Sequence, residues 1–135
     1  MMFDVTATEL ISVTSITLII MEGTNIKLDI WTMAGTYNGN HTNSDAWEIL
    51  TSSSTINLGQ LSFVTIPIPL TEIQAESTQS FYATYAEDSE SDVGMYCEDL
   101  PAPLGDDDKV EIKSTARVFV NSEAFSNPSY GQYSL

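Results

Sequence analysis

The sequence predicts an all-β domain, an antiparallel β-sandwich of jelly-roll type with about eight to ten strands. Three observations predict it. Ser and Thr account for 31 of the 135 residues, and Thr-, Val- and Ile-rich sequence with little Lys favours strand over helix. Apolar and polar residues alternate in short runs, which is the period of a half-buried strand. Turn signals separate these runs about every ten residues, as in sandwiches and barrels.

The expected strands follow one another along the whole chain. The first is Phe3–Ala7, in which Asp4 and Thr6 take the polar positions. The alternation that starts at Ile11 changes phase after Val13, so we expect a bulge or tight corner at Thr14–Ser15. Further alternating runs occur at residues 16–20, 26–30, 64–70, 81–85 and 110–112.

Turn residues mark the ends of several runs. Glu22–Asn25 is typical of a hairpin loop, and Asn38–Asn40 is typical of a tight turn. Gly35 and Gly39 lie around Tyr37, where we expect both glycines to take a positive φ so that the loop can double back.

Two further local features concern the middle of the chain. Pro67 and Pro69 cannot donate to a sheet, so their run must lie at an edge or leave the sheet. Thr71–Ser77 is compatible with one short turn of helix.

With no repeat and no long linker, residues 1–135 are expected to form a single domain.

The charge balance excludes several classes of partner. Nineteen Asp and Glu residues face four Lys and Arg, which gives a net charge of -15. A nucleic-acid binder needs a basic face, so we expect no nucleic-acid partner. Anionic lipid would be repelled in the same way. No apolar run reaches the roughly 18 residues of a spanning helix, so no membrane insertion is expected.

The sequence also argues against catalysis. One His and one Cys leave no material for His- or Cys-built metal or nucleophile clusters, and we expect no enzyme activity. Cys97 itself is expected to be a buried free thiol. An intermolecular disulfide is the alternative for an unpaired Cys in a secreted chain.

Three stretches resemble a known module. The opening Met2–Ala7 begins Met-Phe-Asp-Val, residues 30–39 carry Thr-Met-Ala-Gly-Thr-Tyr-Asn-Gly, and residues 42–50 contain Trp47. Together they resemble a β-sandwich module that occurs, usually as one of several units, in large secreted proteins of diatoms and some bacteria. The resemblance implies an extracellular or cell-surface location, a wall-associated or adhesive role, and a larger parent protein.

The aromatic residues of this region have two interpretations. Trp31 and Trp47 can be buried in the core, or one of them can be a platform on which a sugar stacks. A sugar site needs an exposed ring flanked by polar side chains, and the nearby loop supplies Asn38, Asn40, His41 and Asn43. The candidate carbohydrate-binding residues are Trp31, Tyr37, Asn38 and Trp47.

Carboxylates are concentrated in residues 87–108, where no Lys or Arg occurs. Their repulsion can be relieved by salt or by a bound hard cation, and calcium suits irregular, oxygen-rich loops. The spacing is not that of an EF-hand. A solvated acidic loop is therefore the simple interpretation, and a calcium site is the alternative. The candidate calcium ligands are Asp106, Asp107, Asp108, Glu87 and Asp88.

These observations lead to a non-catalytic extracellular module with a structural or adhesive function. Its expected partners are protein or polysaccharide surfaces, and self-association is possible on the same grounds. The alternatives are a calcium-dependent carbohydrate-binding module and a self-assembling subunit of an extracellular filament or layer. Asn40 begins an Asn-His-Thr glycosylation sequon on the expected turn.

Overall fold

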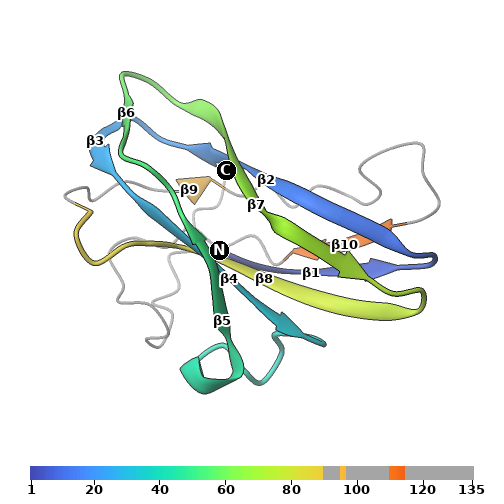
Figure 1. Ribbon diagram of the computed structural model, residues 1–135. Helices are drawn as coiled ribbons and strands as arrows, with labels where there is room; N and C mark the ends of the chain where they lie inside the picture. The colour runs from blue at the N-terminus through green and yellow to red at the C-terminus, as the bar shows by residue number, and fades with distance from the viewer. Residues whose placement is uncertain (90–94, 97–109, 115–135) are drawn as a thin grey trace, which may run out of the picture.

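Alternating side chains form strands in the part of the chain that the computed structural model describes, residues 1–89, 95–96 and 110–114 (Figure 1). Burial follows the alternation: in the second strand Ile16, Leu18 and Ile20 are buried, while Thr17 between them is exposed. The elements are β1 (Met2–Ala7), β2 (Ile11–Ile20), β3 (Gly23–Ile26), β4 (Leu28–Ala34), η1 (Ser44–Ala46), β5 (Glu48–Ser52), β6 (Ile56–Leu58), β7 (Ser62–Ile73), β8 (Ser77–Tyr85), β9 (Met95–Tyr96) and β10 (Val110–Ser114).

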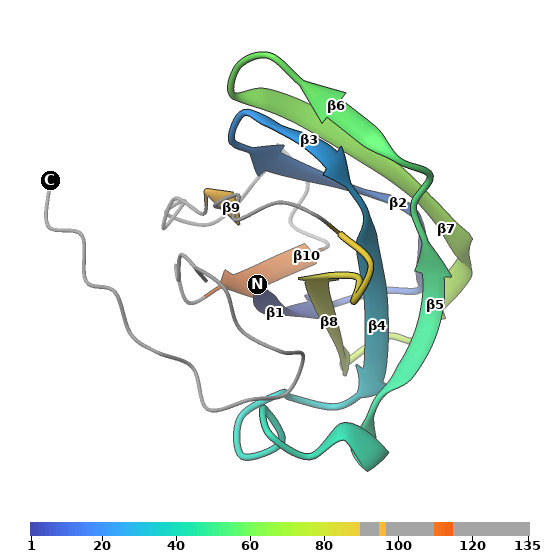
Figure 2. The ribbon, with the colours of Figure 1, turned by 90° about the vertical axis from the view of Figure 1, so that its left-hand side faces the viewer.

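The strands form two facing sheets and a smaller ribbon. One sheet has the order β10-β1-β8-β4-β5, the second has the order β7-β2-β9, and β3 pairs with β6. Every pairing between described strands is antiparallel. Figure 2 shows the two layers, with β4, β5 and β7 curving round one side of the molecule. The prediction of an antiparallel all-β sandwich is confirmed.

The core lies between the two sheets. Ile30 and Phe81 point inward from the five-stranded sheet, and Leu18 and Ile66 meet them from the other sheet. Each side chain of this size contributes roughly 1.5–3 kcal/mol when it is fully buried. The Phe3 ring stacks on the Phe81 ring with centroids 5.5 Å apart, which joins β1 to β8 inside the core.

The bulge expected in β2 is present. The register between β2 and β7 shifts between Val13 and Ser15, so Thr14 has no directly opposed partner. Between the flanking pairs β2 has one residue and β7 has three, residues 68–70. Ile16, Leu18 and Ile20 are buried after the bulge, as the change of phase predicted.

The proline prediction is confirmed, because β7 lies at an edge of its sheet within the described part of the chain. The helical turn over Thr71–Ser77 is wrong. β7 continues to Ile73, and β8 begins at Ser77 after a tight turn in which Glu76 has a φ of 57°. The Glu76 N–H donates to the Ala7 carbonyl at 2.8 Å, so contact with the end of β1 fixes the turn.

The hairpin loop expected over Glu22–Asn25 is also wrong. Gly23 already belongs to β3, and β3 pairs with β6 and not with β2. The Asn25 N–H donates to the Asn57 side-chain oxygen at 2.8 Å. Asn25 has a φ of 52°, and a partner more than thirty residues away therefore contributes to a conformation that does not form the expected hairpin.

Candidate functional site

A row of large side chains crosses the outer face of the five-stranded sheet. The register places Met2 opposite Tyr82, Tyr82 opposite Trp31, and Trp31 opposite Ile49. The row therefore crosses β1, β8, β4 and β5. Met2 and Tyr82 are buried, Trp31 is half-buried, and Ile49 is 49% exposed. The burial of this row therefore decreases from β1 towards β5, where Ile49 is open to solvent.

The β4–β5 loop, residues 35–47, covers the buried end of this row. Trp47 lies edge-on to Tyr82 with ring centroids 5.8 Å apart, and only 6% of Trp47 is exposed. Its indole N–H donates to the Asn40 carbonyl at 3.0 Å, so the ring also closes its own loop. Tyr37 and Met33 pack against the same cluster. These contacts make a second, smaller core outside the sandwich.

Two glycines shape this loop as the sequence predicted. Gly35 has a φ of 86° and Gly39 a φ of 84°. A Cβ at either position would meet no atom within 4 Å, so the need for glycine comes from the backbone and not from lack of space. The turn at Gly39 is closed by the Asn40 N–H, which donates to the Tyr37 carbonyl at 2.8 Å.

Asp4 holds the start of the loop to the sheet. Its carboxylate accepts hydrogen bonds from the Thr36 hydroxyl at 2.6 Å and from the Tyr37 N–H at 3.1 Å. The Ser80 hydroxyl lies 2.5 Å from the same carboxylate and 2.6 Å from the Gly35 carbonyl. Sequence reasoning missed this role for Asp4. Its only signal is an acidic residue at an outward position of the first strand, which is not specific.

The four candidate carbohydrate residues occupy different environments. Trp31 and Tyr37 are half-buried, Trp47 is buried, and Asn38 is exposed. Trp31, Tyr37 and Trp47 belong to one cluster, in which Trp47 is part of the buried centre. Of the two tryptophans, Trp31 thus keeps more of its ring available to a ligand. Asn40, the sequon residue, is half-buried on the turn.

Glu87 and Asp88, two of the candidate calcium ligands, lie just after β8. Asp88 forms an ion pair with Lys27, and Glu87 is exposed. The hydrogen bond from Lys27, aided by its positive charge, lowers the pKa of Asp88 below its ordinary value of 3.8. Within residues 1–89, no three His, Asp or Glu side chains gather as a metal site would require. The candidate ligands Asp106, Asp107 and Asp108, like Cys97, lie outside the described residues.

The outer face of β2 and β7 has a different chemistry, which sequence reasoning did not single out. Thr17 and Thr65 lie opposite each other and share a hydrogen bond of 2.9 Å, and both are exposed. Phe63 is 75% exposed on the same face, opposite Ile19. Glu72 is the one charged residue of these two strands. The signal was present in the sequence, since Ser, Thr and Pro fill the polar positions of both strands.

The described residues include no helix that is both long and apolar enough to cross a membrane. Comparison of the chain with family models, curated proteins and solved structures gives no match. The geometry above is therefore the basis for assigning a function.

Proposed function

We propose that this chain is a non-catalytic module of an extracellular or cell-surface protein, and that it adheres through the outer face of β2 and β7. The observation that carries the proposal is a partly apolar face, with Glu72 as its one charged residue, on a chain with a net charge of -15. We call this surface, formed by the exposed residues of β2 and β7 other than Glu72 near the end of β7, the threonine face.

Charge explains why such a face favours contact. The carboxylates elsewhere on the chain repel an anionic surface at short range, and this repulsion weakens with added salt. The threonine face has hydroxyl groups for hydrogen bonding and the Phe63 ring for apolar contact. A sheet face with this composition fits an uncharged partner, such as a neutral polysaccharide or an uncharged patch of another protein.

The test compares two substitutions that add the same charge in different places. Thr65→Glu puts a carboxylate in the middle of the threonine face, and Thr55→Glu puts one at an exposed loop position between β5 and β6. Adsorption is measured on films of cellulose, of an alkyl monolayer and of a carboxylated monolayer. We expect the wild-type chain and Thr55→Glu to bind a neutral film equally, and Thr65→Glu to bind about tenfold less. Equal binding by all three chains would contradict the proposal.

Phe63 provides a second, independent measurement. Replacing Phe63 by a small residue removes no core contact, because three quarters of Phe63 is exposed. Burying it at an interface is worth about 1–2 kcal/mol, so Phe63→Ser should weaken binding roughly five- to thirtyfold. The melting temperature should stay within about 2 °C of that of the wild-type chain.

A carbohydrate-binding function remains as a second candidate because of Trp31. Its half-buried ring lies on the outer face of β4 beside Ile49, which is 49% exposed. The measurement is tryptophan fluorescence during titration with soluble neutral oligosaccharides, with calcium or with EDTA. A saturable change that Trp31→Phe weakens and EDTA abolishes supports this function. A titration without any change argues against it.

A further inference from the structure

β7 is the last strand of its sheet among the described strands, and it pairs with β2 along its whole length. With 12 residues it is also the longest of the described strands. The last strand of a sheet has one row of backbone N–H and C=O groups that its neighbour does not use, and such a row can template pairing with another chain. A strand of this length therefore needs a feature that prevents such pairing.

Charge does not protect β7. Residues 49–71 contain no Asp, Glu, Lys, Arg or His, and Glu72 lies near the far end of the strand. Residues 61–66, Leu-Ser-Phe-Val-Thr-Ile, combine β-branched and aromatic residues with no charge and no proline, as in segments that form intermolecular sheets. Phe63 is 75% exposed and Leu61 is 52% exposed. The repulsion between whole chains is screened once salt is added.

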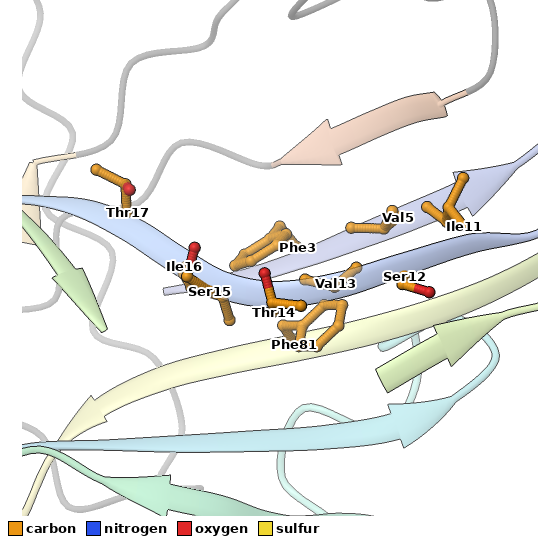
Figure 3. A pocket seen from close by; sticks show the side chains of 10 residues that line it. All are labelled: Phe3, Val5, Ile11, Ser12, Val13, Thr14, Ser15, Ile16, Thr17 and Phe81. Carbon is orange, nitrogen blue, oxygen red and sulfur yellow. The ribbon is translucent and has the colours of Figure 1, made fainter. Parts of the chain in front are cut away.

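The register between β2 and β7 fixes the direction of each backbone group. In antiparallel strands, opposed pairs that exchange two N–H···O=C hydrogen bonds alternate with pairs that exchange none. Pro67 lies opposite Ser15 and has no N–H, so this pair is of the second kind. Thr65 lies two residues away, opposite Thr17, so its pair is of the second kind as well. Figure 3 shows Ser15 and Thr17 on β2, beside the bulge.

The side chains of Thr17 and Thr65 agree with this assignment. Opposed residues that exchange no backbone hydrogen bonds have their side chains closer together, and the two hydroxyl oxygens are 2.9 Å apart. The N–H groups of Val64 and Ile66 therefore point towards β2, whereas that of Thr65 points away from it. Pro67 takes the next position in this outer row. The direction of the row follows from β2 and β7 alone.

Two prolines interrupt the outer row. Pro67 removes the donor that would follow Thr65, without loss to the pairing with β2. Pro69 lies in residues 68–70, where β7 has three residues opposite Thr14, and such a bulge also bends an edge away from a regular partner. We propose that Pro67 and Pro69 block strand addition at the outer edge of β7, so that copies of this chain do not join through it into a continuous sheet.

This block is independent of the proposed adhesion. Adhesion uses the side chains of the threonine face, whereas strand addition uses the backbone at the edge of β7. The block argues against an extracellular filament or layer that is built through β7. Its failure would leave the adsorption measurements on the threonine face unaffected, because those measurements change side chains and not backbone donors.

The first test is amide hydrogen exchange of the wild-type chain, followed by NMR. The Phe63 amide is two residues from that of Thr65 and also points away from β2. We expect the Phe63 and Thr65 amides to exchange at least about tenfold faster than the Val64 and Ile66 amides, which point to β2. Equal protection of all four amides would overturn the proposal, because another strand would then already pair with this edge.

The second test restores the missing donors. Pro67→Thr/Pro69→Thr adds two N–H groups and no charge. Sedimentation velocity is measured in about 0.5 M NaCl, where charge repulsion is screened. We expect a monomeric wild-type chain and a double variant that forms dimers or larger species with rising concentration, in which the Phe63 and Thr65 amides become protected. The same state of association for both chains would overturn the proposal, and so would association without this protection.

A matched pair of proline substitutions tests the orientation of the edge. Thr65→Pro removes an outward donor, so adding it to the double variant should return that variant to the wild-type state of association. Alone, it should lower the melting temperature by less than about 4 °C, whereas Val64→Pro removes a donor to β2 and should lower it by about 10 °C or prevent folding. Equal losses for the two single variants would overturn the proposal even if the double variant did not fold.

Discussion

The Ser80 hydroxyl stands 2.5 Å from the Asp4 carboxylate, although the two residues are 76 positions apart in the sequence. The register of β1 and β8 places them directly opposite each other. Ser80 is fully buried, so its hydroxyl has no access to water and depends on Asp4 and on the Gly35 carbonyl. This contact, made by the outer face of the sheet, fixes where the β4–β5 loop begins.

The first prediction concerns Asp4→Ala. The substitution removes the acceptor for Ser80, Thr36 and the Tyr37 N–H, and leaves a buried hydroxyl with one acceptor. We expect a loss of about 2–4 kcal/mol in the free energy of unfolding, measured with urea. Asp29→Ala is the control, because the Asp29 carboxylate accepts a hydrogen bond from the Ser52 hydroxyl at an exposed position of the sheet. It should cost less than about 1 kcal/mol, and similar losses for both variants would show that Asp4 has no special role.

The second prediction concerns the loop glycines. Ala at Gly35 or Gly39 must adopt a φ near 85°, which costs roughly 1–2 kcal/mol, and Val should cost more. Gly59 has equal space for a Cβ but no positive φ, so Gly59→Ala should be neutral or slightly stabilising. Urea unfolding of the three Ala variants checks this. Neutral substitutions at both Gly35 and Gly39 would contradict the role of the backbone.

The third prediction concerns the pH dependence of the Lys27–Asp88 pair. The pKa of Asp88 is lowered in the folded chain, so the pair stabilises the fold above the ordinary value of 3.8 and the contribution is lost as pH falls through the lower, folded value. NMR titration of the Asp88 carboxyl should show a pKa below 3.8 that returns towards 3.8 in Lys27→Gln. The effect on stability should be small because the carboxylate is exposed. An unchanged pKa in Lys27→Gln would contradict the assignment of the cause.

Features that depend on neighbouring residues were predictable from the sequence. The bulge at Thr14 follows from a change in apolar phase, and the positive φ of Gly35 follows from the glycine spacing of the loop. Both depend on a few adjacent residues, so the pattern contains the necessary information.

Features that depend on distant partners were not predictable. β3 pairs with β6, and Lys27 pairs with Asp88 across 61 positions. No local pattern marks such partners, because many residues of the same type compete for each one. The prediction of a helical turn over Thr71–Ser77 was wrong for the same reason, since the tight turn at Glu76 is fixed by the Ala7 carbonyl at the end of β1.

The last prediction concerns cations, and the Lys27–Asp88 pair makes it more specific. A net charge of -15 should make the melting temperature rise with NaCl over the first few hundred millimolar, since salt screens the repulsion. If calcium binds in residues 87–108, millimolar calcium should add about 2–3 kcal/mol, or about 5–10 °C, over EDTA at matched ionic strength. Magnesium should add much less, because it demands stricter geometry and dehydrates reluctantly.

Substitutions then locate the ligands. Asp88 already has an ammonium partner, so Asp88→Asn should leave the calcium shift unchanged. Asp106→Asn, Asp107→Asn and Asp108→Asn should each reduce it, because these residues directly precede β10, whose pairing with β1 gives the segment a fixed end. Equal shifts with calcium and magnesium would mean that screening alone acts. A calcium shift that Asp88→Asn abolishes would mean instead that the cation displaces Lys27 from its partner.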